Sequence, residues 1–383
     1  MVTSGNLDAM GTWNGIELDD LELQSGALLL RPWRRSDAPA VEAIMADERM
    51  SEYLPLPRPY TAADAVDFVT GFATDGRRRG TRIECALEVG GELVGAAGLH
   101  LPVAGCEPAI GYWVASAHWG QGYATQAART LASFGFDHGI HRIEIKADVA
   151  NAASAATALR AGFRFEAIQR QSVRSQHGYA DHAVFARLAG DAGEPIAPSF
   201  PPLSEVSDGT VILRPVRAED WPVILAENVN PEQQRWGFGN VMTEAEARVR
   251  TATAGLTWLT GRGAELLIVD AETGAGAGTI SLRLSGPPNV AGIGYGVLPE
   301  FRGRHFTTRA LQLLSSWAFE HTPIVRLELG CKVDNVASAR SAERAGFVRD
   351  ARFDARLINP GGATYSDEIG FGLVKPGVQA PRG

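Results

Sequence analysis

Asn151-Ala-Ala-Ser154-Ala-Ala-Thr-Ala-Leu159-Arg-Ala-Gly162-Phe163 is a thirteen-residue stretch that returns, with substitutions, as Asn335-Val-Ala-Ser338-Ala-Arg-Ser-Ala-Glu343-Arg-Ala-Gly346-Phe347. The second copy follows the first by 184 residues. Upstream, other residues repeat at a spacing of 183: Arg31-Pro32 with Arg214-Pro215, Gly111-Tyr112 with Gly294-Tyr295, and Gly120 with Gly303. A spacing that changes by only one residue over more than a hundred positions indicates one domain, duplicated and fused.

The composition is that of a globular protein with room for two domains. The 383 residues are 45% hydrophobic and 21% charged, so each half is large enough to bury its own core. The net charge of -8 is spread along the chain, and we therefore expect no nucleic-acid partner. The one basic run, Arg77-Arg78-Arg79, is interpreted as a solvated loop after a helix.

The three cysteines, Cys85, Cys106 and Cys331, lack the spacing of metal or redox sites, and their odd number argues against a disulfide framework. We therefore expect no metal centre. No apolar run reaches the ~20 residues that cross a bilayer, so we expect no membrane association. The N-terminus lacks the features of a secretory signal, and the cytoplasm is the expected location.

The domain boundaries follow from the two copies and from one stretch without periodicity. That stretch, between the copies, is rich in Pro, Gly, Ser and acidic residues, which is typical of a linker. We predict a flexible N-terminal extension at 1–23, a first domain at 24–189, a linker at 190–208, a second domain at 209–376 and a tail at 377–383.

Hydrophobic periodicity predicts the order β-α-α-β-β-β-α-β-α-β-β in each half. This order is typical of the α/β class, here a mixed, mostly antiparallel sheet with helices on both faces. The first two helices of the first half are predicted at Ser36–Tyr53 and Thr61–Thr74, with Ser36 and Thr61 as N-caps. The predicted helices of the second half begin with Ala218–Asn228 and Thr243–Leu259.

A loop with two glycines one residue apart, Gly120-Gln121-Gly122, joins a strand that ends at Val114 to a helix. Glycines let a backbone approach a ligand closely, and the helix start offers free N–H groups and the positive end of the helix dipole. Together these favour a pyrophosphate site, although an ordinary glycine turn has the same pattern. A Rossmann site is excluded, because the third glycine is missing and the loop follows a hairpin strand.

The chain carries an ordered set of features: a Gly-Tyr strand, the glycine loop with Tyr-Ala-Thr, a helix, a strand, the Asn-x-x-Ser helix and Gly-Phe. This set resembles the GNAT superfamily of N-acetyltransferases in both halves. The nearest branch is that of the ribosomal-protein N-terminal acetyltransferases. The resemblance implies two tandem GNAT-like domains and acetyl-CoA as co-substrate. It implies that the strand ending at Val114 pairs with the pantetheine arm, that Asn151 binds the pantetheine region and that Ser154 lies near the thioester sulfur. It places the pyrophosphate on the backbone of Trp119, Gly120, Gln121, Gly122, Tyr123 and Ala124.

Ser154 is the candidate proton donor. The thiolate that leaves a thioester benefits from a nearby donor, and a hydroxyl at a helix start can serve. Asn151 and Ser154 also form a good N-cap pair, so a purely structural role is equally compatible with the sequence.

A carboxylate is the candidate base, because the acceptor amine must lose a proton before or during its attack. Glu144, on the strand before the Asn-x-x-Ser helix, and Glu107, before the Gly-Tyr strand, are the first candidates. Asp181 and Asp367, at matching places before the last strand of each half, are further ones. Taken singly, each glutamate fits a solvent-facing position on a strand better than a base.

The second half carries the loop in altered form, Phe301-Arg302-Gly303-Arg304-His305. His305 stands where Gly122 stands, and a side chain there crowds a bound pyrophosphate if the backbone needs a positive φ. Gly296 replaces Trp113, which predicts a wider cleft. These changes favour a scaffold over a second working site. The residues that would serve a second acyl-CoA site are Arg302, Gly303, Arg304, Asn335 and Ser338.

The function predicted from these features is transfer of an acetyl group, or a longer acyl group, from acyl-CoA to a primary amine by direct attack. The acceptor is a protein or peptide N-terminus or a small amine. The alternative is a non-catalytic acyl-CoA-binding protein with a regulatory or scaffold role, which turnover distinguishes. The duplication predicts either a monomer with an internal pseudo-dimer or a homodimer.

Overall fold

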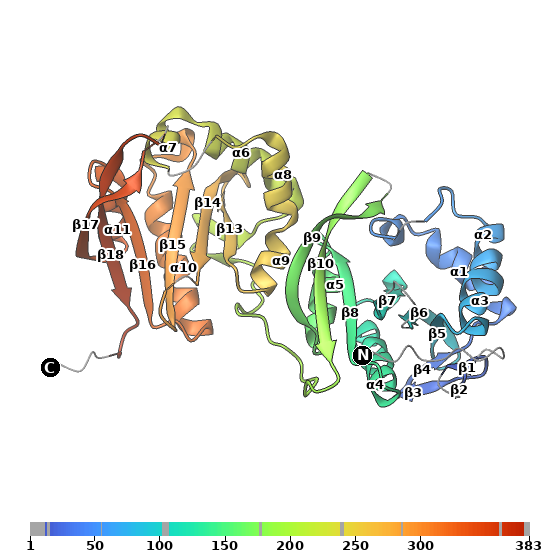
Figure 1. Ribbon diagram of the computed structural model, residues 1–383. Helices are drawn as coiled ribbons and strands as arrows, with labels where there is room; N and C mark the ends of the chain where they lie inside the picture. Colours follow the sequence, from blue (N-terminus) through green and yellow to red (C-terminus); the bar gives the residue numbers. More distant parts are fainter. Residues whose placement is uncertain are drawn as a thin grey trace. The chain divides into compact units, whose positions relative to one another are not determined.

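The computed structural model describes residues 12–13, 16–54, 56–101, 107–175, 178–237, 241–284, 286–359 and 362–378. Contacts within the chain divide it into two compact units, unit 1 (Met1–Ala197) and unit 2 (Pro198–Gly383), drawn in Figure 1. Each unit holds one eight-stranded sheet with helices, which confirms the tandem α/β arrangement. Cys106 and most of the predicted extension lie outside the described residues.

In unit 1 the sheet has the strand order β3-β4-β5-β6-β7-β8-β10-β9, and β7 and β8 are the pair that run parallel. The strands are β1 (Thr12–Trp13), β2 (Ile16–Glu17), β3 (Leu23–Ser25), β4 (Leu28–Arg31), β5 (Arg82–Val89), β6 (Glu92–His100), β7 (Ala109–Val114), β8 (Arg142–Asp148), β9 (Arg164–Ser175) and β10 (Gly178–Leu188). The helical segments are η1 (Arg35–Asp37), α1 (Ala38–Met45), η2 (Glu48–Ser51), α2 (Ala62–Asp67), the π-helical η3 (Phe68–Phe72), α3 (Ala73–Arg78), η4 (Ser116–His118), α4 (Tyr123–Asp137) and α5 (Ala152–Arg160).

Unit 2 repeats this topology in the order β11-β12-β13-β14-β15-β16-β18-β17, with β15 and β16 parallel. Its strands are β11 (Val206–Ser207), β12 (Val211–Pro215), β13 (Ala264–Asp270), β14 (Gly276–Arg283), β15 (Val290–Val297), β16 (Arg326–Lys332), β17 (Val348–Ile358) and β18 (Tyr365–Val374). Its helical segments are η5 (Ala218–Asp220), α6 (Trp221–Val229), α7 (Pro231–Trp236), α8 (Glu244–Ala252), α9 (Ala254–Leu259), η6 (Pro299–Phe301), α10 (Phe306–His321) and α11 (Val336–Arg344).

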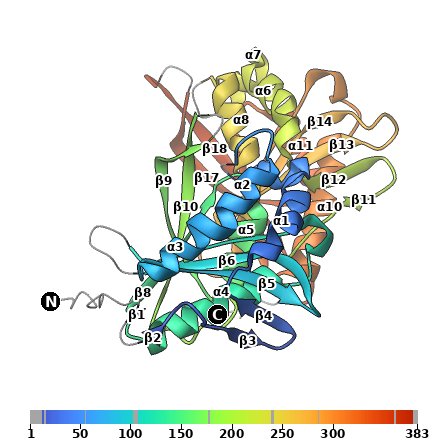
Figure 2. The same cartoon turned by 90° about the vertical axis from the view of Figure 1, so that its right-hand side faces the viewer.

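Both faces of each sheet are covered, as the alternation of side chains along the strands requires. On β13, Leu266 and Ile268 pack into one core cluster with α10 and α11, whereas Leu267 and Val269 pack into another with α6 and α8. In unit 1, α3 contacts β5 and lies over it in Figure 2, and α4 contacts β6 and β7.

Some helix boundaries differ from the prediction. Thr61 caps α2, accepting the Asp64 N–H at 3.3 Å, which confirms this N-cap. Ser36 does not cap α1, because Asp37 precedes that helix and Ser36 lies in a 3₁₀ turn. The helix predicted at Thr243–Leu259 is two helices that meet at Thr253.

The segment assigned to a linker makes specific contacts in the structure. Ile196 donates its backbone N–H to Leu159 C=O in unit 1 at 2.9 Å. Phe200 is fully buried in the core of unit 2, where Trp258 Nε1 donates to its carbonyl at 3.2 Å. The described part of the chain contains no helix with both the length and the apolar character needed to cross a membrane.

Candidate active site

The glycine loop of unit 1 is bare backbone that leads directly into the start of α4. Gly120 and Gly122 have φ values of +78° and +82°, and a Cβ on either would meet nothing within 4 Å. Gly122 precedes α4, and the Gln126 N–H donates to its carbonyl at 3.0 Å. The N–H groups of the turn before Gln126 have no partner within the helix. This geometry fits a phosphate or pyrophosphate group.

Trp119 and a cation lie beside this loop. Trp119 Nε1 donates to the Val114 carbonyl at 2.7 Å, so its indole folds back onto the end of β7. The Arg49 guanidinium lies 5.6 Å from the Trp119 ring centroid. Arg49 is held by Asp47 at 2.6 Å and by Ser116 at 2.8 Å. Hydrogen bonds from Arg49 and Ser116 hold the pKa of Asp47 well below its usual range.

Asn151 and Ser154 form the predicted cap of α5, and a tyrosine joins them. Asn151 Oδ1 accepts the Ser154 N–H at 2.9 Å. The Ser154 hydroxyl lies 3.1 Å from the hydroxyl of Tyr112 on β7. Burial raises the pKa of Tyr112 to about 12, so this hydroxyl stays protonated at neutral pH. Sequence reasoning used Tyr112 only as a landmark of the repeat, and that repeated Gly-Tyr pair was the signal that could have identified it.

Unit 2 preserves the same arrangement. Asn335 Oδ1 accepts the Ser338 N–H at 3.1 Å, and the Ser338 hydroxyl lies 2.8 Å from that of Tyr295. Burial raises the pKa of Tyr295 to about 12. The tyrosine–serine pair is therefore a duplicated feature of the fold.

The two predicted glutamates have different surroundings. Glu144 is 7% exposed, and its oxygens lie 2.7 Å from Arg142 Nη2 and 3.5 Å from Lys146 Nζ. Glu107 is exposed in the segment before β7. Among the described residues, neither glutamate makes a hydrogen bond with Ser154, whose hydroxyl contacts Tyr112, and the roles of Glu107 and Glu144 stay predictions.

The two predicted aspartates serve the strand pairs at the end of each unit. Asp181 accepts the backbone N–H of Gln171 at 2.8 Å. Asp367 accepts the backbone N–H of Ala355 at 2.9 Å and pairs with Arg352 at 2.7 Å. These hydrogen bonds give both aspartates a structural role.

The altered loop of unit 2 keeps the backbone shape of the first. Gly303 has a φ of +74° and His305 one of +63°, so His305 adopts the left-handed conformation of a glycine. Histidine is among the residues that tolerate this region best. The substitution therefore changes what the loop exposes and leaves its course unchanged.

Both arginines of the altered loop have acidic partners. Arg302 forms an ion pair with Glu232 and donates from Nε to the Val297 carbonyl at 3.3 Å. Arg304 Nη2 lies 3.1 Å from Asp270, which is 2% exposed. A phosphate at this loop would have to compete with these carboxylates.

The prediction that Gly296 widens the cleft of unit 2 is wrong. A Cβ at Gly296 would overlap the carboxylate of Glu227, which α6 places in that space. Thr279 Oγ1 donates to Glu227 at 3.0 Å, and burial raises the pKa of Glu227 to about 7. A side chain from another element thus occupies the place left by the missing tryptophan.

Comparison with protein families gives a match in each half. The model described as the acetyltransferase (GNAT) domain matches residues 27–164 and 210–348. Among curated proteins, the chain is similar to the uncharacterized N-acetyltransferase YoaA of Bacillus subtilis, with 29% identity over 152 residues, 39% of this chain and 86% of that protein. It is also similar to the uncharacterized N-acetyltransferase p20 of Bacillus licheniformis, with 24% identity over 172 residues, 43% of this chain and 95% of that protein.

Solved structures of similar proteins match about one half of the chain. RimL, a ribosomal L7/L12 alpha-N-protein acetyltransferase solved with coenzyme A, has 25% identity and a TM-score of 0.41, covering 44% of this chain and 98% of that one. RimJ of Mycobacterium smegmatis, solved with a CoA-disulfide, has 26% identity and a TM-score of 0.39, covering 44% of this chain and 86% of that one.

Proposed function

Because the chain belongs to the GNAT acetyltransferase family in both of its halves, we propose that it transfers the acetyl group of acetyl-CoA to a primary amine by direct attack. The observation that carries this proposal is the loop of unit 1, where two left-handed glycines and a helix start face open space. The acceptor is a peptide or protein N-terminus or a small amine, and a longer acyl donor is compatible with the same loop.

Three residues of unit 1 have separate roles in the transfer reaction. Asn151 fixes the start of α5 through the Ser154 N–H. Ser154 gives a proton to the departing sulfur, and Tyr112 orients the serine hydroxyl through their contact at 3.1 Å. Bound acetyl-CoA supplies the activated acyl carbon.

Unit 2 is proposed as a scaffold. Its loop keeps the required backbone shape, but Arg302 and Arg304 are already paired with Glu232 and Asp270. The exposed His305 side chain replaces the bare backbone of the first loop. These features reduce the capacity of the second loop to hold a pyrophosphate.

Calorimetric titration of acetyl-CoA into the intact chain tests this assignment. We expect one site per chain. Two sites would overturn the scaffold role of unit 2, and an absence of binding would overturn the proposed function. Release of CoA thiol in the presence of amines then separates a transferase from a protein that only binds acyl-CoA.

Ser154→Ala is expected to lower kcat by about 100-fold, the usual contribution of one positioned proton donor. The affinity for acetyl-CoA should stay within about twofold of the wild-type value, because the loop is untouched. Steady-state rates and calorimetry measure the two quantities. Ser338→Ala in unit 2 is the matched control and should leave kcat unchanged. An unchanged rate in Ser154→Ala would return this residue to a capping role.

A further inference from the structure

Glu84 carries a buried carboxyl group in unit 1 that has no role in the proposed acetyl transfer as described so far. It lies on β5, is 8% exposed, and bends over Gly98 of β6, where a Cβ would overlap both of its oxygens. Among the described residues, the basic side chain nearest its carboxylate is His100, with Nε2 at 4.0 Å from a carboxylate oxygen. In the described part of the chain, no arginine or lysine lies within ion-pair distance of this carboxylate, and Arg77 Nε donates to the Glu84 backbone carbonyl at 2.9 Å.

β7 and β8 pair at Ala109 with Glu144 and separate beyond this pair. The register of the sheet leads from Glu84 towards this separation. Glu84 pairs with Gly98, and Gly98 pairs with Gly111 on β7. Paired residues face the same side of a sheet, and neighbouring strands lie about 5 Å apart. A Cβ at Gly111 would meet nothing within 4 Å. The Glu84 carboxyl group thus covers Gly98, and Gly111 leaves bare backbone beside it.

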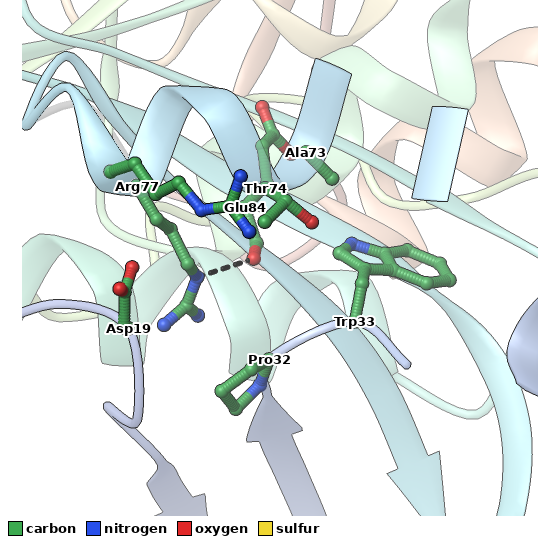
Figure 3. A pocket seen from close by; sticks show the side chains of 8 residues that line it. Asp19, Pro32, Trp33, Ala73, Thr74, Arg77 and Glu84 are labelled. Carbon is green, nitrogen blue, oxygen red and sulfur yellow. Dashed lines mark hydrogen bonds between the residues drawn. The ribbon is translucent and has the colours of Figure 1, made fainter. Parts of the chain in front are cut away.

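A cavity of about 210 Å³ adjoins Glu84 on the side of α3. Figure 3 shows Trp33, Thr74 and Arg77 around it. Trp33 is 9% exposed, and its Nε1 has no hydrogen-bond partner among the described residues. The wall of this cavity therefore contains the unpartnered N–H of Trp33 and, from Glu84, the backbone carbonyl that accepts from Arg77 Nε at 2.9 Å (Figure 3).

Unit 2 has a carboxylate at the same place in its sheet, and there it is neutralised. Glu265 on β13 pairs in register with Ser281, which pairs with Gly294. Arg250 of α8 forms an ion pair with Glu265, with Nε at 3.1 Å. Arg283 Nη2 would lie 2.7 Å from a Cβ at Gly294, so it covers that glycine. The backbone left bare at Gly111 in unit 1 is thus covered in unit 2.

We propose that Glu84, lying over Gly98, binds the acceptor amine above Gly111 and accepts its proton. This inference rests on the proposed function and names the base of the same site. As the amine nitrogen bonds to the thioester carbon, its proton passes to the Glu84 carboxylate. The carbon–sulfur bond breaks, and the sulfur takes a proton from Ser154, which regains one from water. Glu84 then releases its proton to solvent.

Burial, opposed by two nearby arginines, sets the pH at which Glu84 acts. Burial raises the pKa of Glu84 to about 7, while the charges of Arg82 and Arg77 oppose this shift. Burial, followed by the charge of Arg82, lowers the pKa of His100, so its imidazole is neutral at pH 7. The titratable and charged groups that face Glu84 or its cavity are Arg82, His100, Arg77, Arg78 and Asp19. The ionised fraction of Glu84 therefore rises with pH through about 7, and the rate of transfer should rise with it.

The test compares Glu84→Gln with Glu265→Gln in the full chain. The probes are tripeptides with free N-termini and a set of small primary amines, and release of CoA thiol is followed from pH 6 to 8. Glu84→Gln should lower kcat/KM by at least about 100-fold and remove the rise in rate near pH 7. Its affinity for acetyl-CoA should stay within about twofold of wild type. Glu265→Gln should keep both the rate and the pH profile.

Each outcome has one meaning. Thiol release by Glu84→Gln within threefold of wild type would overturn the role of Glu84 while leaving the proposed transferase intact. Loss of acetyl-CoA affinity in Glu84→Gln would also overturn the role of Glu84. The substitution would then lower the rate by disturbing the structure of unit 1, and not by removing a base. Binding of acetyl-CoA without thiol release by the wild-type chain, with any of the amines, would overturn the transferase proposal and this inference with it.

Discussion

Replacing Gly122 with valine is expected to abolish acetyl-CoA binding by unit 1, with a loss of affinity of at least about 100-fold. Gly122 has a φ of +82°, a conformation that costs a residue with a Cβ about 1–2 kcal/mol and a β-branched residue more. If the loop relaxes to avoid this cost, the N–H groups at the start of α4 turn away from the pyrophosphate. Each lost hydrogen bond to a charged group is worth about 1.5–3 kcal/mol, and about 2.7 kcal/mol corresponds to 100-fold.

His305→Val is the matched control, because His305 holds the corresponding helix start of unit 2 at a φ of +63°. It imposes the same kind of strain, yet binding by unit 1 should remain. Calorimetric titration of both variants measures the number of sites, and thermal unfolding shows whether each remains folded. Equal losses in the two variants would show that the second loop also binds acetyl-CoA.

The parts of the site that the sequence predicts are those built from local geometry. Two glycines before a helix require no partner from elsewhere to adopt positive φ values, and the structure gives them +78° and +82°. Asn151 and Asn335 cap their helices through N–H groups three residues ahead. Such features depend on neighbours in the chain, so a pattern of residue types is enough to find them.

The parts that the sequence does not predict depend on side chains brought in from distant elements. The cleft expected at Gly296 is filled by Glu227, because α6 packs against the neighbouring strand β14 and carries this side chain into the space. Glu84 becomes a candidate base only when the register places it over Gly98. Neither contact can be recognised from the local hydrophobic periodicity of the sequence, since any polar residue on a strand gives the same pattern.

Even a local cap can be displaced by a tertiary contact. Ser36 has the residue type and position of an N-cap, but it lies inside the 3₁₀ turn η1, whose start is fixed by the Asp37 carboxylate accepting the Arg34 N–H. Asp37 is held in place by Arg31, whose guanidinium donates two hydrogen bonds to the Asp37 carboxylate. The pair recurs in unit 2 as Arg214 with Asp220, so the repeat itself contained the missing signal.

Replacing Asp37 with alanine is expected to destabilise unit 1 by about 3 kcal/mol, because removing one partner leaves a charge buried. Both oxygens lie 2.8 Å from Arg31, whose side chain is only 4% exposed, and one also accepts the Arg34 N–H at 2.8 Å. Glu88, at 2.6 Å from Arg31, remains as a second partner and limits the loss. Burial tends to raise the pKa of Asp37, but the hydrogen bonds from Arg31 and Arg34 outweigh it and lower that pKa. The stabilisation is therefore complete above the ordinary value of about 3.9 and is lost as the pH falls below it.

Hydrogen exchange measured peptide by peptide assigns the effect of Asp37→Ala to one unit. Amides of β5 and β6 should exchange on the order of 100-fold faster, whereas those of β13 and β14 should keep their wild-type rates. Asp75→Ala is the surface control, since Asp75 and Arg78 are more than half exposed and 3.9 Å apart, and its effect should stay below about 0.5 kcal/mol. Similar exchange in the two variants would mean that Glu88 alone satisfies Arg31. The recurrence of the pair as Arg214 with Asp220 would then reflect the capping of a helix start more than the neutralisation of a buried charge.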